Sequence, residues 1–302
     1  MGISETMNLI QIVVLALIQG AAELLPVSSS AHVIVAERLM GLDPSSPEMT
    51  FLLVMLHTGT MFAVLFYFRH RWKRILLSPE RRSHFARMLV VATACTGVVG
   101  FGLKKAIEKI ILEHALGFEK GEIENLFGNL PLVAAALFAA GLLIIWAGRR
   151  EKKPEPITLE PIEAPEKGLT TRASIWIGVV QGLCLPFRGF SRSGATVSTA
   201  LLKGISRETA EDFSFALAVI LTPPVIVLEL QRLLKHADGG PALDLSSLLA
   251  PGALGMVFSL ASGLIALRVL SAWLENGRWR FFGYYCVTAS LVVGGLHFSG
   301  WV

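Results

Sequence analysis

Ionisable and hydroxyl side chains interrupt an apolar run near the N-terminus of this 302-residue chain. Glu23 follows Gln19 by four residues, which places both side chains on one face of a helix. Pro26 breaks that helix, and three serines open the next one. Hydroxyls and free backbone N–H groups at a helix start favour an anion. The serines are Ser28, Ser29 and Ser30.

His32 follows Ser29 by about one helical turn. A carboxylate, a hydroxyl and an imidazole close together suit nucleophilic catalysis, in which a base activates the hydroxyl. The alternative is structural: Ser28 or Ser29 caps the helix, Glu23 extends toward water, and His32 is an interior histidine.

A second cluster of donors lies in the other half of the chain, around Arg192 and Arg188. The planar guanidinium fork of Arg192 suits phosphate, and Arg188 adds a second positive charge. The alternative is that Arg192 pairs structurally with Glu23 or Glu229. The hydroxyl and glycine residues expected at this phosphate site are Gly189, Ser191, Ser193, Gly194 and Thr196.

Both clusters together predict a site for a phosphorylated ligand. Because Glu23 would repel a phosphate, we expect a divalent cation, Mg²⁺ or Ca²⁺, between the two, held by Glu23 with or without Gln19. Membrane depth makes the ligand a lipid.

The composition requires a membrane: 53% of the residues are hydrophobic, 17% are charged, and the mean hydropathy is +0.60. The sequence therefore predicts an all-α polytopic membrane protein, without nucleic-acid binding despite a net charge of +4. Three isolated cysteines, Cys95, Cys184 and Cys286, predict buried hydrophobic residues rather than a zinc site or disulfides. Six runs of spanning length lie at about 51–68, 86–103, 130–147, 213–233, 248–270 and 281–298.

Two further apolar regions, 8–40 and 173–203, are interrupted midway and predict re-entrant helical hairpins. Both carry Gln-Gly, a break and a serine-rich turn, so they indicate an inverted-topology repeat whose tips meet near the bilayer midplane. The whole chain, 1–302, is then one membrane domain. Its parts are repeat 1 at about 8–147, an unstructured proline-rich linker at about 148–172, and repeat 2 at about 173–300.

Charge predicts the orientation. Segment 69–87 holds seven arginines and lysines against Glu80 alone, so we expect a cytoplasmic loop there. Counting from this loop, 148–172 and 271–280 are cytoplasmic as well. The remaining loops, 41–50, 104–129 and 234–247, face outward. The first hairpin then opens outward and the second inward.

The two motifs together give a resemblance. Gln19-x-x-x-Glu23 with Pro26-Val27-Ser28-Ser29-Ser30-Ala31-His32, and the segment from Gly189 to Thr196, closely resemble the undecaprenyl-diphosphate phosphatase family, also known as bacitracin-resistance proteins. The resemblance runs over nearly the whole chain. It implies a multi-pass enzyme of the bacterial inner membrane that removes the terminal phosphate of a polyprenyl diphosphate. This reaction recycles the lipid carrier of peptidoglycan synthesis.

Three positions depart from the family pattern. Many members carry glutamate at the position of Gln19, proline usually stands at that of Arg188, and Ala31 replaces a frequent glycine. For Gln19, the departure implies a weaker or differently filled cation site. For Arg188, two effects stay open: tighter phosphate binding through the extra arginine, or a shifted substrate preference.

The expected mechanism has Arg192 holding the diphosphate while Ser29 attacks the terminal phosphorus with His32 as its base. Attack by His32 itself, or by a water that it activates, stays open. A second class of function, transport of an isoprenyl phosphate lipid across the membrane, is compatible with inverted repeats. A non-catalytic lipid-binding or resistance protein is a weaker third. A homodimer is compatible with the sequence, which does not fix the oligomeric state.

Overall fold

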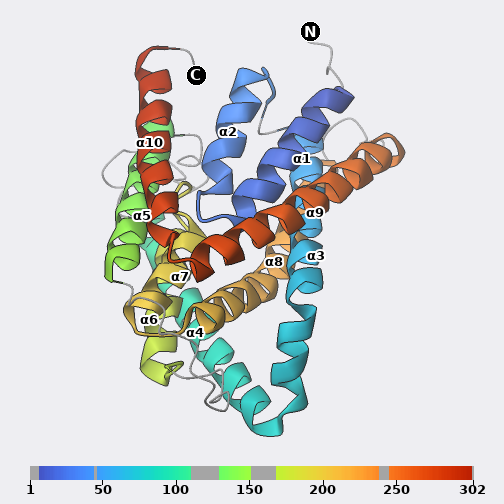
Figure 1. Ribbon diagram of the computed structural model, residues 1–302. Coiled ribbons are helices and arrows are strands. Elements are labelled where there is room, and N and C mark those ends of the chain that lie inside the picture. The colour runs from blue at the N-terminus through green and yellow to red at the C-terminus, as the bar shows by residue number, and fades with distance from the viewer. Residues whose placement is uncertain (1–6, 44–45, 110–128, 151–167, 238–244, 301–302) are drawn as a thin grey trace.

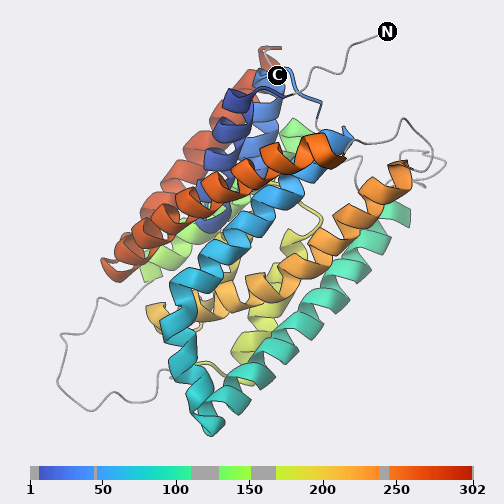
Figure 2. The same ribbon diagram turned by 90° about the vertical axis from the view of Figure 1, so that its right-hand side faces the viewer.

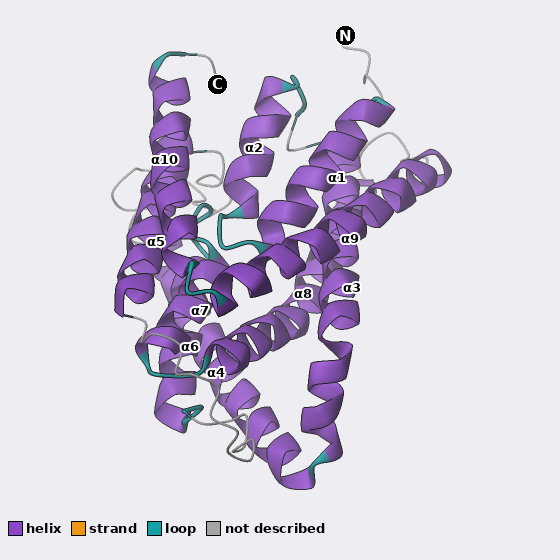
Figure 3. Cartoon of the chain, viewed as in Figure 1, coloured by secondary structure: helices purple, strands orange, loops and turns teal. Residues whose placement is uncertain are grey.

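Every regular element in the described part of the chain is a helix (Figures 1 and 3). The structure is a computed structural model that describes residues 7–43, 46–109, 129–150, 168–237 and 245–300. The helices are α1 (Leu9–Leu24), α2 (Ser29–Leu39), α3 (Pro47–Leu77), α4 (Pro79–Ala106), α5 (Leu130–Arg150), α6 (Thr171–Cys184), α7 (Arg192–Leu202), α8 (Arg207–Ala237), α9 (Leu245–Glu275) and α10 (Trp279–Phe298).

Six of these helices, α3, α4, α5, α8, α9 and α10, are long and apolar enough to cross a membrane. Each contains one of the six predicted spans, so that prediction is confirmed and the protein is a multi-pass membrane protein. The helices extend beyond the apolar runs at their ends, because a helix continues into the polar boundary of a bilayer where its charged side chains reach water.

The two interrupted regions each form a pair of short helices, as the sequence predicts. Residues 25–28 separate α1 from α2, which pack on one another, and 185–191 separate α6 from α7, which do the same. Figure 1 shows α1 and α2 in one half of the molecule and α6 in the other, while the chain breaks of both pairs lie in the middle. Re-entry of both pairs from opposite membrane faces stays a prediction.

The basic segment 69–87, which its charge predicts to be cytoplasmic, is helical along almost its whole length. Helix α3 runs to Leu77 and α4 starts at Pro79, so Ser78 alone connects them, as Figure 2 shows at the lower end of the molecule. Arginine and lysine are good helix formers, and Pro79 suits a first helical position. Most of the predicted linker lies outside the described residues, since α5 includes 148–150 and 151–167 are not described. Much of the predicted outer loops, 110–128 and 238–244, also lies outside them.

One of the seven basic residues of that segment is partly buried and belongs to an ion-pair network. Arg71 of α3 contacts Glu211 at 2.7 Å and Asp212 at 3.0 Å, both on α8. Ser271 of α9 donates a hydrogen bond to Glu211 and accepts one from Tyr67. Because charges away from water need partners, this network fixes α3, α8 and α9 against one another.

Close helix contacts depend on small residues. The most extensive pairings join α5 to α10, α3 to α9, α1 to α9 and α4 to α6. Gly141 of α5 and Gly283 of α10 face each other, and a Cβ atom on Gly283 would lie 2.7 Å from the Gly141 carbonyl oxygen. Small residues at such crossings let two backbones approach closely, which strengthens packing between helices in lipid.

We expect Gly283→Ala to lower the melting temperature of the detergent-purified protein by several degrees, because the added methyl group overpacks the α5–α10 contact by about 1–3 kcal/mol. Gly294→Ala is the matched control on the same helix, since nothing lies within 4 Å of a Cβ there. Equal melting temperatures for the two variants would contradict this account of the contact.

Candidate active site

Two serines define the break between α1 and α2. Ser28 has a φ of +67°, a left-handed conformation that is unusual for serine, and its side chain makes no capping hydrogen bond. Ser29 is the first residue of α2. The alternative that Ser28 caps this helix is therefore not what the structure shows, and the strained backbone lies directly beside the candidate nucleophile.

The Glu23 carboxylate is the centre of the site. Its Oε1 accepts a hydrogen bond of 2.9 Å from Nη2 of Arg192, and its Oε2 accepts one of 2.5 Å from the Ser29 hydroxyl. The Gln19 amide lies 3.4 Å from the same Oε2. The expected pairing of Arg192 with Glu23 is therefore present, and it joins the two halves of the chain.

A backbone group of each break also binds a serine side chain from the opposite helix pair. The Gly189 N–H donates to Ser30 Oγ at 3.3 Å, and Ser193 Oγ donates to the Leu25 carbonyl at 3.3 Å. Gly189 has a φ of +105°, and a side chain there would collide with the backbone of Val133 in α5. The turn before α7 therefore requires glycine at this position.

His32 is held at both ring nitrogens. Nδ1 lies 2.8 Å from the Ser28 carbonyl oxygen, which can only accept, so Nδ1 carries the proton. Nε2 then accepts from the Tyr285 hydroxyl of α10 at 2.7 Å, and the two rings stack at 5.6 Å. The hydrogen-bond partner of Ser29 is thus Glu23, whereas the sequence led us to expect His32.

The remaining predicted site residues support the start of α7. The Ser191 side chain caps this helix by accepting from the Gly194 N–H at 3.2 Å. Thr196 donates to the Arg192 carbonyl at 2.9 Å and lies 2.6 Å from Ser214 Oγ of α8. These contacts hold the backbone that presents Arg192. The hydroxyl groups of Ser191 and Thr196 are therefore already engaged and are not free for a ligand.

The arrangement suits transfer of a phosphoryl group to a serine. The Ser29 hydroxyl, a group that can attack phosphorus, already donates its hydrogen bond to a carboxylate that can accept a proton. Arg192 places a guanidinium beside that carboxylate, where it can meet the charge on phosphate oxygens. Both side chains of the ion pair are about one-fifth exposed, 21% for Arg192 and 17% for Glu23, so a ligand can reach them.

Comparison with known proteins gives the family. The model of the bacitracin resistance protein BacA family matches residues 12–292. The chain belongs to this family. It is 54% identical over 297 residues to undecaprenyl-diphosphatase 2 of Acinetobacter baylyi, covering 96% of this chain and 98% of the relative.

More distant relatives match over the same extent. Undecaprenyl-diphosphatase 2 of Burkholderia ambifaria is 33% identical over 98% of this chain and 97% of its own length. Undecaprenyl-diphosphatase 1 of Burkholderia pseudomallei is 32% identical with the same coverage. The BacA family resemblance that the two motifs predicted is confirmed, and it spans both of them.

Arg188 has an electrostatic partner that the sequence did not suggest. Its charge acts on the carboxylate of Glu37, a residue of α2 that is only 1% exposed. Burial is the larger influence on this carboxylate, and the charge of Arg188 is the smaller one. Arg188 therefore offsets part of the cost of burying Glu37.

Three residues near the BacA site were missed by the sequence reasoning: His57, Tyr285 and Glu37. His57 of α3 interacts electrostatically with Glu23. His57 and Glu37 were detectable as ionisable groups among apolar neighbours, which are functional candidates in membrane helices. Tyr285 carried no such signal, because aromatic residues are common in membrane helices and only packing places it at His32.

The donor set fits the divalent cation expected from the sequence. Carboxylate, amide and hydroxyl oxygens are the ligands that Mg²⁺ and Ca²⁺ prefer, and Mg²⁺ is often held by one carboxylate together with substrate phosphates. Glu23 and Gln19 supply the first two, once the amide turns its oxygen inward. Within the described residues, no group of three or more histidine, cysteine or acidic residues could hold a metal.

We expect Arg188→Ala to lower the melting temperature of the protein, because the buried Glu37 carboxylate loses a nearby positive charge. Thermal unfolding in detergent measures this loss. The double variant Arg188→Ala/Glu37→Gln should recover most of the stability. If the second substitution adds a further loss instead, the charge coupling between the two residues is refuted.

Proposed function

We propose that this protein hydrolyses the terminal phosphate of undecaprenyl diphosphate, giving undecaprenyl phosphate and inorganic phosphate. The observation that carries this is the hydrogen-bonded set of Ser29, Glu23 and Arg192, which places nucleophile, base and phosphate-binding cation together. The names of the similar proteins support the same substrate.

The first step is an exchange of partners at Glu23. When the diphosphate arrives, its oxygens compete with the Glu23 carboxylate for Arg192. Oε2 of Glu23 stays hydrogen-bonded to the Ser29 hydroxyl and is the acceptor for its proton. Arg192, now bound to the substrate, stabilises the charge on the transferring phosphoryl group.

Ser29 Oγ then bonds to the terminal phosphorus while the bond from phosphorus to the bridging oxygen breaks. The Ser29 proton moves to Glu23 Oε2, and undecaprenyl phosphate leaves with the electron pair of the broken bond. Glu23 loses this proton to water. In the second half of the reaction, water attacks the phosphorus of the phosphoserine, and the bond from phosphorus to Ser29 Oγ breaks. A proton passes from this water by way of Glu23 to Ser29 Oγ, and inorganic phosphate leaves.

We also propose Mg²⁺ or Ca²⁺ as the cofactor, held by Glu23 and Gln19 together with the substrate. A bound cation supplies neutralising charge between Glu23 and the diphosphate, which would otherwise repel each other. Because glutamine offers a neutral oxygen where many members carry glutamate, we expect the affinity of this site for the cation to be lower than in those members.

The lipid substrate and the six apolar spans support a place in the bacterial inner membrane, which we propose as the location. Peptidoglycan synthesis and bacitracin resistance are the processes that the reaction would serve. A homodimer stays an expectation from the sequence.

We expect the detergent-purified protein to release phosphate from undecaprenyl diphosphate in Mg²⁺, and EDTA to abolish the release. Arg192→Ala should lower kcat/KM at least 10³-fold, in line with the loss of a phosphate-clamping arginine. A folded Arg192→Ala variant with ordinary turnover would contradict the proposed role. If the wild-type protein binds the lipid but releases no phosphate, lipid transport becomes the favoured function.

Ser29→Ala should remove turnover to a similar extent, whereas Ser30→Ala keeps the nucleophile and serves as its neighbouring control. Rapid acid quench of the wild-type protein with labelled substrate should trap one phosphoserine, at Ser29. Substantial turnover by Ser29→Ala would instead assign the attack to His32 or to water.

A further inference from the structure

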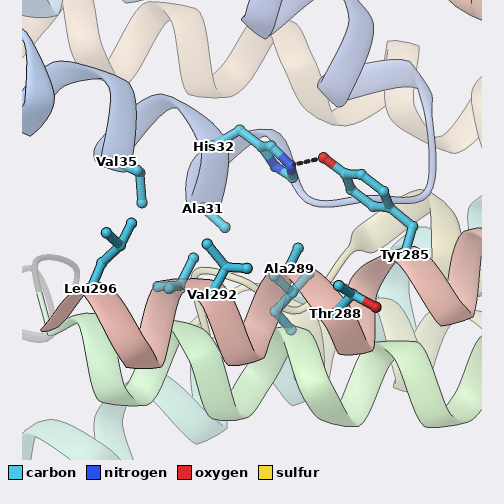
Figure 4. Close-up of a pocket in the computed structure, with 10 residues that line it drawn as sticks. Ala31, His32, Val35, Tyr285, Thr288, Ala289, Val292 and Leu296 are labelled. Carbon is cyan, nitrogen blue, oxygen red and sulfur yellow. Dashed lines mark hydrogen bonds between the residues drawn. The ribbon is translucent and has the colours of Figure 1, made fainter. Parts of the chain in front are cut away.

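An apolar groove leads away from the catalytic residues, with a volume of about 300 Å³ (Figure 4). Its walls come from α2 and α10, and Leu137 of α5 also lines it. Figure 4 shows His32 and Tyr285 at one end of the groove and Val35 and Leu296 at the other, with Ala289 and Val292 between.

No free polar group lines this groove. The Thr288 hydroxyl donates back to the Tyr284 carbonyl of its own helix at 3.0 Å. The Tyr285 hydroxyl is bonded to His32, and His32 is held by the Ser28 carbonyl. A phosphate placed here would lose water without gaining a donor, so the groove suits a hydrocarbon chain and excludes a charged headgroup.

His32 belongs to both the groove and the catalytic site. It lies one helical turn after Ser29, whose hydroxyl contacts Glu23. His32 Nδ1 is held by the Ser28 carbonyl of the chain break that precedes Ser29, and the His32 ring also lines the groove, so the groove begins beside that break. An amphiphile whose phosphates meet Arg192 and Ser29 would place its hydrocarbon chain past His32 into the groove.

We propose that this groove binds the isoprenyl segment next to the diphosphate, and that the stacked His32–Tyr285 pair marks the junction of headgroup and chain. The proposal rests on the proposed function, because it names the site for the chain of that substrate. From Tyr285 to Leu296 the groove follows α10 for roughly 16 Å at 1.5 Å per residue. That length is far shorter than an extended undecaprenyl chain, so most of the chain lies in the bilayer.

Photolabelling tests the proposal without requiring hydrolysis. The probe is a farnesyl bisphosphonate, in which carbon replaces the bridging oxygen of the diphosphate, with a diazirine on the isoprene unit next to the headgroup. In the purified wild-type protein we expect adducts on α2 and α10 at residues that line the groove, and competition by undecaprenyl diphosphate. A farnesol with the same diazirine should label the groove at least tenfold less.

Adducts confined to other helices would overturn the proposal. Equal labelling by the farnesol, without competition by undecaprenyl diphosphate, would also overturn it, because any lipid chain would then occupy the groove. Competed labelling of the groove in a protein that releases no phosphate would uphold the groove as a site for prenyl diphosphates and refute only the phosphatase activity.

Substitution gives a second measurement. Val292→Phe narrows the groove, whereas Leu291→Phe places the same side chain on the neighbouring position, which does not line it. We expect Val292→Phe to lower the ratio of kcat/KM for undecaprenyl diphosphate to that for methyl diphosphate about tenfold, mainly through KM. Leu291→Phe should leave the ratio unchanged. Equal ratios in both variants would refute the assignment of the groove to the chain.

Discussion

The ion pair between Glu23 and Arg192 is the constraint on which the rest of the structure depends. The two residues are 169 positions apart in the sequence, and each follows or precedes a break in an apolar helix pair. A charge shielded from water costs several kcal/mol unless it finds a partner, and each of these two charges finds a partner in the other half of the chain. The pair therefore holds the breaks at 25–28 and 185–191 together.

The same contacts that satisfy these charges also prepare the chemistry. The Glu23 carboxylate is shared by Arg192, Ser29 and Gln19, which stabilises a partly exposed acid and holds it beside the hydroxyl that it would deprotonate. A diphosphate offers Arg192 a stronger partner than the carboxylate does. The ion pair and the recognition of substrate thus depend on one exchangeable hydrogen bond.

The surroundings of the site divide polar from apolar space. On the side of α7, capping and turn contacts position a guanidinium and a left-handed glycine, Gly189. On the side of α10, aliphatic side chains line a groove that begins at Tyr285. His32 lies between the two, with both ring nitrogens bonded. This division matches the two halves of a lipid diphosphate.

The sequence by itself determined the membrane class, the six spans, both chain breaks and most of the polar side chains that meet between the breaks, because composition, apolar run length and helix breakers act locally. It did not predict that the basic segment 69–87 is helical, which follows from the helix propensity of arginine and lysine. Only the tertiary structure decided that Ser29 bonds Glu23, that Arg188 acts on Glu37, and that Tyr285 reaches His32 from 253 positions away. These contacts depend on how helices pack against one another, and neither residue spacing nor composition encodes which side chains meet across that packing.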